Sequence, residues 1–304
     1  MARTRKPAPA TTGTAVHIRA LLPSLQPSMR QVAERVLADT TATAGLTVTE
    51  LALASGVSEA TVVRFCKAIG FAGYPQLRLA LAAEAGRAEG ADRNGREVDT
   101  DIQRGDDLAR VVEKIAFADA RAVEETGAQL DIVALGRVVE ALVRAERVDL
   151  YGVGASAFVA LDFQQKLHRI GRVAFAWPDT HVALTSAALL RPGDVAIGIS
   201  HTGTTTDTID ALTEARAHGA TTVALTNFPR SPIARAAEHV LTTAARETTF
   251  RSGATASRLA QLTVVDCLFV GVAQRTYDQT LAALDATRTA VSSRHTSSMR
   301  NRAR

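Results

Sequence analysis

Residues 200–205 read Ser-His-Thr-Gly-Thr-Thr and gather three hydroxyl groups, on Ser200, Thr202 and Thr205, around Gly203. The hexapeptide lies between an apolar run and a helical pattern, so we expect it to join a strand to a helix. At such a junction the free N–H groups and the dipole of the helix favour an anion. A glycine there lets the backbone approach a ligand closely. The pattern therefore indicates a phosphate-binding loop, and an ordinary Ser/Thr helix cap is the alternative.

A second loop of the same kind, Gly152-Val-Gly-Ala-Ser156, follows another apolar run and also opens a helix. The spacing G-x-G-x-x-A is shared with dinucleotide sites, which need an acidic residue at the end of the second strand. That position reads Phe175-Ala-Trp-Pro, and Asp179 falls beyond it. We therefore expect no nicotinamide cofactor, and the spacing of the two cysteines predicts no metal site.

The elements that position these loops are short runs rich in Val, Ile and Leu, alternating with helical stretches. This alternation favours a parallel sheet that is covered by helices on both faces. The runs are 148–151, 173–175, 195–199, 222–225 and 240–241.

Residues 46–70 carry a different pattern, of two short helices joined by a tight turn. Thr47 is suited to cap the first helix with Glu50 as its capping-box partner. Gly56 is suited to a left-handed turn, and Ser58 to capping the second helix. Such a pair predicts a helix-turn-helix, whose second helix enters the major groove of DNA. A helical hairpin without a DNA-binding role is the alternative.

The second helix of this pair divides into an apolar stripe and a polar face. The polar face is expected to contact DNA, with its N-terminal end at the base edges and Arg64 on a guanine or a phosphate. A carboxylate at Glu59 has an alternative role, because it also favours the dipole of its own helix. The expected stripe is Val57, Val62, Phe65 and Ile69, and the expected DNA-binding residues are Ser58, Glu59, Thr61, Arg64 and Lys67.

These motifs resemble a known family. The segment 58–67, with the Gly-Phe-Ala-Gly-Tyr-Pro that follows at 70–75, resembles the N-terminal domain of the RpiR-type, phosphosugar-responsive bacterial regulators. The two glycine loops resemble those of the sugar isomerase (SIS) domain, in which the second loop reads Ser-x-Ser-Gly-x-Thr. Thr202 replaces the second serine and keeps the hydroxyl. The SIS resemblance covers about residues 128–280.

The resemblance implies an all-α helix-turn-helix domain followed by a three-layer α/β domain with a five-stranded parallel sheet in flavodoxin-like order. It also implies a ligand at the carboxyl ends of the strands, and dimerisation through the SIS domain. By the same resemblance, Glu247 lies near the sugar end of the ligand, and His201 offers its backbone N–H to the phosphate. The implied phosphosugar-binding residues are Ser156, Ser200, His201, Thr202, Gly203, Thr205 and Glu247.

Charge and composition agree with a DNA-binding protein. The net charge of +4 combines a basic start, +4 over residues 1–90, and a basic end, +5 over 286–304, so the middle carries −5. A basic end on an acidic body suits a nucleic-acid binder with a separate sensing domain. No apolar run reaches the ~18 residues needed to span a bilayer, and the two cysteines form no pair. We expect a cytoplasmic protein.

We therefore expect a transcriptional regulator, not an enzyme, that binds operator DNA as a homodimer or larger homo-oligomer under control of a phosphosugar. A phosphosugar isomerase with an accessory helical domain is the alternative, because function resides in the site and not in the fold. The expected divisions are a disordered arm (1–15), the helix-turn-helix domain (16–83), a linker and connecting helix (84–127), the SIS domain (128–285) and a basic disordered tail (286–304).

Overall fold

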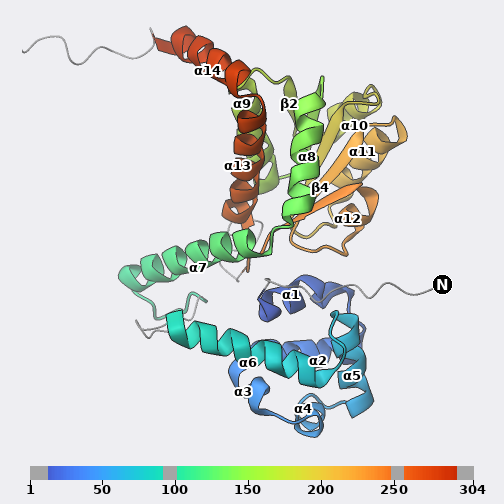
Figure 1. Cartoon of the computed structure of the whole chain (residues 1–304), viewed down its shortest axis with the longest axis vertical. Helices are drawn as coiled ribbons and strands as arrows, with labels where there is room; N and C mark the ends of the chain where they lie inside the picture. The colour runs from blue at the N-terminus through green and yellow to red at the C-terminus, as the bar shows by residue number, and fades with distance from the viewer. Residues whose placement is uncertain (1–12, 92–100, 248–256, 293–304) are drawn as a thin grey trace, which may run out of the picture.

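The computed structural model describes residues 13–91, 101–247 and 257–292 of the chain. It has a helical N-terminal domain and an α/β C-terminal domain, and the long helix α7 (Leu108–Gln129) runs between them (Figure 1). None of the helices within these ranges is long and apolar enough to cross a membrane.

The helical domain packs around one apolar core, which includes Val62, Phe65 and Ile69 of the expected stripe. Tyr74 closes one side of this core: it is 4% exposed, and its hydroxyl donates hydrogen bonds to the carbonyls of Thr43 (3.2 Å) and Leu46 (2.8 Å). The elements are α1 (Thr14–Leu21), the 3₁₀ helix η1 (Leu22–Ser24), α2 (Pro27–Ala38), α3 (Thr40–Gly45), α4 (Val48–Ala54), α5 (Glu59–Ala68) and α6 (Tyr74–Ala91).

The C-terminal domain contains a five-stranded sheet in the order β2-β1-β3-β4-β5, with every neighbouring pair parallel. This confirms the expected fold class. The strands are β1 (Val148–Gly152), β2 (Ala174–Trp177), β3 (Val195–Ile199), β4 (Thr221–Thr226) and β5 (His239–Thr242). The helices are α8 (Ile132–Arg144), α9 (Ala155–Arg169), α10 (Thr180–Ala187), α11 (Thr206–Ala217), α12 (Pro232–Ala236), α13 (Ser257–Arg275) and α14 (Tyr277–Ser292).

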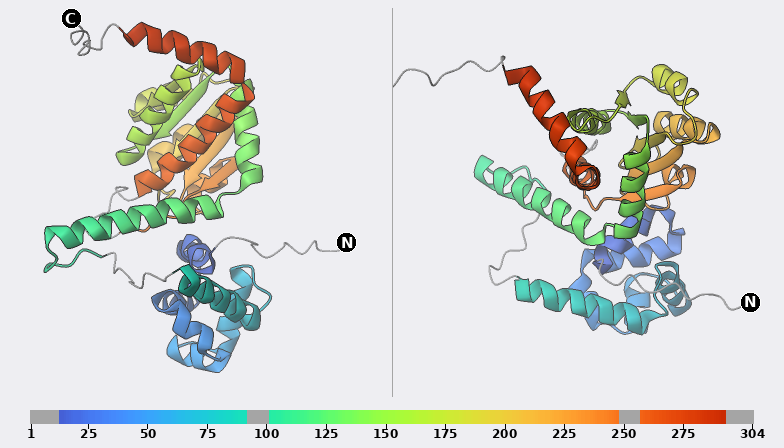
Figure 2. Two further views of the ribbon diagram at one scale, coloured as in Figure 1. Left: turned by 60° about the vertical axis from the view of Figure 1, so that its left-hand side comes forward. Right: turned by 45° about the horizontal axis from the view of Figure 1, so that its top comes forward.

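Two apolar clusters fix the layers of this domain. Helices α8, α9 and α13 cover one face of the sheet, and α10, α11 and α12 cover the other (Figures 1 and 2). Strands β1 and β3 are fully buried, as expected for central parallel strands. In their register Gly152 pairs with Ile199, so the two glycine loops leave the sheet side by side.

Several expected boundaries differ from the structure. Helix α6 continues to Ala91, so residues 84–91 of the expected linker are helical, and α14 carries the chain to Ser292, past the start of the expected tail. Helix α1 begins at Thr14, inside the expected arm. Ala, Leu, Glu and Arg favour helix strongly enough to outweigh single glycines, which cost about 1 kcal/mol each. The remainders of the arm and tail, and residues 92–100 of the linker, lie outside the described residues.

Candidate functional site

The helix-turn-helix forms as its caps predict. The side chain of Thr47 accepts a hydrogen bond from the backbone N–H of Glu50, and the Glu50 carboxylate accepts one from the Thr47 N–H. The Thr47 N–H and the Thr47 hydroxyl, which both donate to the Glu50 carboxylate, hold the pKa of Glu50 below its ordinary value. Gly56 has φ +65°, the left-handed conformation that the turn requires. Ser58 accepts from the N–H of Thr61 and so caps α5.

Four of the five residues expected to contact DNA are exposed on α5 or at its N-cap: Ser58, Glu59, Arg64 and Lys67. Thr61 is the exception, with only 4% of its surface exposed. It lies four residues before the buried Phe65, on the same side of the helix. Its hydroxyl accepts a hydrogen bond from Nη2 of Arg64 at 3.0 Å. The expectation that Thr61 lies on the open face is therefore wrong, and its side chain instead orients Arg64.

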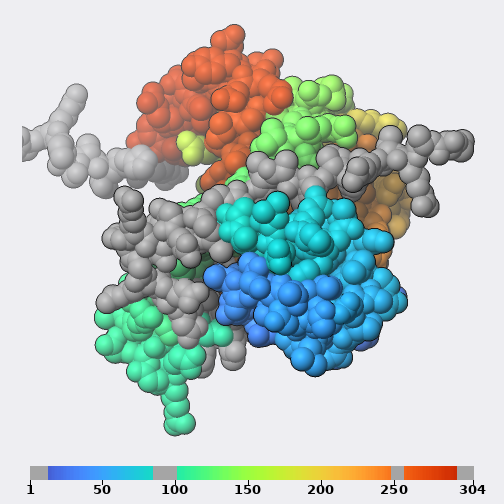
Figure 3. All heavy atoms as spheres, turned by 60° about the horizontal axis from the view of Figure 1, so that its bottom comes forward, coloured from blue at the N-terminus to red at the C-terminus, as the bar shows by residue number. Residues whose placement is uncertain are grey.

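Glu59 also has a partner within the domain. The hydroxyl of Thr49, on α4, donates a hydrogen bond to Oε1 of Glu59 at 2.6 Å. Glu59 therefore links the two helices of the motif at their solvent-facing side. The side of the helical domain that faces away from the α/β domain is uncovered (Figure 3).

The loop after β1 is shaped by close packing of its backbone. A Cβ atom at Gly152 would lie 2.8 Å from the carbonyl oxygen of Ser156, so only glycine fits there. Ser156 is 4% exposed and lies in the first turn of α9. The side chain of Gln261, on α13, approaches the Ser156 hydroxyl through Nε2 at 3.5 Å.

The loop after β3 brings its hydroxyls together. Ser200 is 3% exposed, and its Oγ lies 3.1 Å from Oγ1 of Thr205 and accepts the backbone N–H of Gly203, also at 3.1 Å. Thr202 is exposed and pairs with the hydroxyl of Thr204 at 2.8 Å. Of the three predicted hydroxyls, Ser200 and Thr205 therefore meet, whereas Thr202 lies on the outer side of the loop.

Gly203 allows the loop to fold onto the next strand. It has φ +66°, and a Cβ atom there would lie 2.1 Å from Oγ of Ser231 and 2.9 Å from Oγ1 of Thr226. The hydroxyl of Thr226 in turn donates to the carbonyl of His201 at 3.1 Å. Both the backbone conformation and the space require glycine at this position.

His201 and Glu247 come within electrostatic range of each other. Burial lowers the pKa of His201, and the negative charge of Glu247 partly offsets that effect. Nδ1 of His201 is buried without a hydrogen-bond partner, and its ring packs edge-on against Phe228 with the centroids 5.7 Å apart. The Glu247 carboxylate accepts a hydrogen bond from Ser257 at 3.0 Å.

Three buried polar residues beside these loops were not predicted as site residues. Gln261 is 0% exposed with Oε1 unpaired, Ser231 has an unpaired hydroxyl, and Asn227 donates its backbone N–H to the carbonyl of His201 at 3.0 Å. Unpaired buried polar atoms are uncommon, and each needs a reason. In the sequence, Gln261 is a polar residue between two apolar ones, Ala260 and Leu262.

The described residues contain no group of three or more His, Cys, Asp or Glu side chains that could hold a metal ion. His181 is exposed at the start of α10, next to a small pocket lined by residues that include Trp177, Thr180 and Asp207.

Both halves of the chain match known family models. Residues 12–87 match the helix-turn-helix domain of the rpiR family, and residues 141–271 match the SIS domain. An HTH-type transcriptional regulator of Caldanaerobacter subterraneus is 40% identical over 277 residues, which cover 91% of this chain and 96% of the relative. The HTH-type transcriptional regulator YbbH of Bacillus subtilis is 34% identical, over 93% of this chain and 98% of its own.

Two solved structures extend the match to three dimensions. The NanR protein of Vibrio vulnificus, complexed with ManNAc-6P, superposes with a TM-score of 0.59 at 29% identity, over 93% of this chain and 99% of that one. The sugar isomerase domain of an RpiR transcription factor from Sphaerobacter thermophilus superposes with a TM-score of 0.55 at 31% identity. This match covers 59% of this chain and 99% of that one. The chain therefore belongs to the RpiR family of helix-turn-helix transcriptional regulators with a C-terminal SIS domain.

Proposed function

We propose that a phosphosugar bound at the carboxyl ends of β1 and β3 controls the affinity of this regulator for its operator DNA. The observation that carries the proposal is the pairing of the Ser200 and Thr205 hydroxyls around the Gly203 backbone, at the N-terminus of α11. This arrangement supplies neutral donors and a helix dipole, which bind a phosphate dianion without a bound cation. NanR, a relative of the same architecture, is complexed with ManNAc-6P.

In this proposal the phosphate lies on Ser156, Ser200, Thr202 and Thr205, with the backbone N–H group of His201, and Gly203 lets the backbone approach the ligand. Glu247 accepts a hydrogen bond from a sugar hydroxyl, which suits a carboxylate whose other contact is the Ser257 hydroxyl. The N-terminal end of α5 enters the major groove, and Ser58, Arg64 and Lys67 contact bases or phosphates.

We also propose that the protein is a cytoplasmic homodimer and not an enzyme. A dimer places two recognition helices in successive major grooves. Glu247 beside His201 is the observation that favours the other candidate, an isomerase, because such a pair can move a proton between carbon atoms of a sugar. Proton NMR of a phosphosugar incubated with the protein separates the two: turnover that Glu247→Gln abolishes would establish the enzyme instead.

The test of sensing is a thermal-shift screen against hexose and hexosamine 6-phosphates, N-acetylmannosamine 6-phosphate among them, with the unphosphorylated sugars as controls. A specific ligand raises the melting temperature by mass action. The double variant Ser200→Ala/Thr205→Val should lose that rise, whereas Thr213→Ala, which removes an exposed hydroxyl further along α11, should keep it. A full response from the double variant would place the ligand elsewhere.

A further inference from the structure

The loops that frame the candidate ligand site also contact the helix-turn-helix domain. Arg230, in the loop after β4, donates a hydrogen bond from Nη2 to the carbonyl oxygen of Ala68 at 3.1 Å. Ala68 is the last residue of α5, the recognition helix. The final carbonyls of a helix have no partner within it, and they carry the negative end of the helix dipole. Arg230 therefore acts as a C-terminal cap supplied by the other domain.

The opposite side of the same loop lies against the predicted phosphate loop. Asn227 donates its N–H to the carbonyl of His201, and the ring of Phe228 packs on the His201 ring. Ser231 fills the space beside Gly203, and the carbonyl of Gly203 accepts the N–H of Ile233. Residues 227–231 thus connect the phosphate loop to the end of α5 through direct contacts.

A second segment, residues 243–247, makes a parallel connection. Oδ1 of Asn227 accepts hydrogen bonds from the Thr243 hydroxyl (3.1 Å) and the Ala245 N–H (2.8 Å), and the hydroxyl of Thr126, on α7, accepts the Ala244 N–H at 3.0 Å. The next two residues, Arg246 and Glu247, contact different parts of the molecule. Glu247 contacts Ser257 and interacts with His201, whereas Arg246 lines the junction between the domains.

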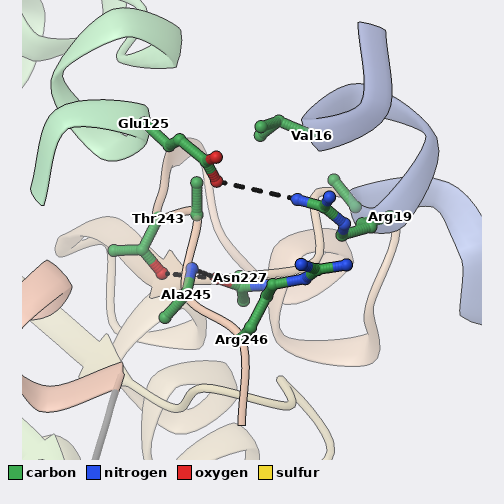
Figure 4. Close-up of a pocket in the computed structure, with 9 residues that line it drawn as sticks. Val16, Arg19, Glu125, Asn227, Thr243, Ala245 and Arg246 are labelled. Atoms are coloured by element: carbon green, nitrogen blue, oxygen red, sulfur yellow. Dashed lines mark hydrogen bonds and ion pairs between the residues drawn. The ribbon is translucent and has the colours of Figure 1, made fainter. Parts of the chain in front are cut away.

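At that junction Arg246 lies beside Arg19 of α1, in a cavity of about 10 Å³ that has room for one water molecule (Figure 4). Arg19 forms an ion pair with Glu125 of α7 at 3.6 Å, and its Nε is buried without a partner. Burial and the nearby charge of Arg246 lower the pKa of Arg19 to about 10. The junction therefore combines attraction of Arg19 to Glu125 and Glu84 with repulsion of Arg19 by Arg246 and Arg121.

We propose that residues 227–231 and 243–246 together form a docking surface for the chain's own helix-turn-helix domain, through which an occupied ligand site sets the position of the recognition helix. This inference rests on the proposed function, because it names the route by which that site controls DNA binding. The route is short: residues 227–231 contact both the His201 loop and the end of α5, and residues 243–246 lead from the junction directly to Glu247, which interacts with His201.

The chemistry of the contacts suits a switch. Arg230 is exposed, and the ion pair of Arg19 is partly exposed and opposed by Arg246, so neither contact holds the domains firmly. Two arrangements of similar free energy can then coexist, and a ligand shifts their populations only if it binds one of them better. A ligand that moves His201 or Glu247 meets that requirement, because both residues abut the docking surface.

Variants of the full-length chain test this surface. Arg230→Ala removes the cap on α5, and Glu125→Gln leaves Arg19 facing Arg246 without its carboxylate. Fluorescence anisotropy with a duplex selected by the wild-type protein from a random library gives the operator Kd, with and without the phosphosugar that shifts the melting temperature. We expect each variant to change the ligand-free Kd and to reduce the ligand response about fivefold or more, within the usual range of allosteric coupling.

Matched controls remove similar contacts elsewhere. Arg216→Ala deletes an exposed arginine that donates to the carbonyl of Ala236 at 3.0 Å, the same chemistry within the α/β domain. Glu124→Gln changes the exposed neighbour of Glu125. Both controls should keep the wild-type Kd and ligand response. A wild-type response retained in full by Arg230→Ala and Glu125→Gln would overturn the docking surface while leaving phosphosugar sensing intact.

A distance measurement distinguishes this failure from failure of the proposed function. Spin labels at Leu53→Cys and Leu189→Cys, both strongly exposed and in different domains, report the domain arrangement in a Cys267→Ser background. Arg230→Ala should broaden the ligand-free distance distribution, and Arg216→Ala should not. In one outcome no phosphosugar alters operator binding, but Arg230→Ala still broadens the distance distribution and shifts the ligand-free Kd. The proposal of phosphosugar sensing is then wrong, whereas the docking surface is supported. An unchanged distribution and Kd would refute the surface.

Discussion

Substitution of Gly203 by alanine should destabilise the α/β domain and abolish phosphosugar binding together. The left-handed backbone at this residue costs an L-amino acid about 1–2 kcal/mol. The new Cβ atom would lie 2.1 Å from Oγ and 2.5 Å from Cβ of Ser231, so the loop must shift. Overpacking of this kind costs about 1–3 kcal/mol. The expected loss of unfolding free energy is therefore about 2–5 kcal/mol.

The assay is thermal unfolding with and without phosphosugar. For a domain of this size 1 kcal/mol corresponds to about 2–4 °C in Tm. Gly193→Ala is the matched control, because Gly193 also has a positive φ, +99°, but nothing lies within 4 Å of its Cβ position. Gly193→Ala should lower the free energy of unfolding only by the cost of the left-handed backbone, about 1–2 kcal/mol. It should keep the ligand-induced rise in Tm.

A second substitution separates the clash from the backbone cost. Ser231→Gly removes the two closest atoms that the new Cβ would meet and leaves only Oγ1 of Thr226, at 2.9 Å, and the Ser231 hydroxyl has no hydrogen-bond partner to lose. Gly203→Ala/Ser231→Gly should therefore be more stable than the sum of the single effects predicts. The steric reasoning fails if Gly203→Ala is no less stable than Gly193→Ala, or if the double variant shows no recovery.

Three further predictions concern other parts of the two sites. Arg64→Ala should weaken operator binding by about 1–3 kcal/mol in anisotropy titrations, with Arg288→Ala on exposed α14 as the neutral control; equal Kd values would remove Arg64 from the DNA contacts. Gln261→Glu should lower phosphosugar affinity in calorimetry more than Gln261→Ala, because a carboxylate replaces the Nε2 donor beside Ser156 and repels the phosphate; equal losses would show a packing role only. Because burial lowers the pKa of His201, ligand-free stability should be full above pH 6.5 and fall below it, as the unfolded chain takes up a proton first; His201→Gln should flatten this dependence, and an unchanged slope would assign it to other groups.

The local elements of both sites could be predicted from the sequence because their causes are local. Thr47 and Glu50 lie three residues apart and cap α4 through each other, and Gly56 adopts the left-handed turn that its position implies. The apolar runs became strands for the same reason, since a buried parallel strand needs little more than consecutive Val, Ile and Leu. The all-parallel order followed from strands alternating with helices.

The errors and omissions have non-local causes. Thr61 is polar and is therefore expected on the open face, but packing of the domain buries it, and its hydroxyl pairs with Ser58 and Arg64. Gln261 approaches Ser156 across 105 residues of sequence, and Arg230 reaches Ala68 across 162. The periodicity of the sequence does not predict such pairings, because they depend on how whole helices and strands pack together.

The distribution of charge links these non-local contacts to the proposed switch. The loop 200–205 contains no Lys or Arg, so a phosphate held there would keep its negative charge uncompensated by the loop itself. Two arginines that line the small cavity between the domains, Arg19 and Arg246, instead repel each other. If the bound dianion lies within about 10 Å of these guanidinium groups, the range of electrostatic effects at moderate salt, it would reduce that repulsion and favour the docked arrangement. A neutral binding loop therefore leaves the charge of its ligand available to act on the contact between the domains.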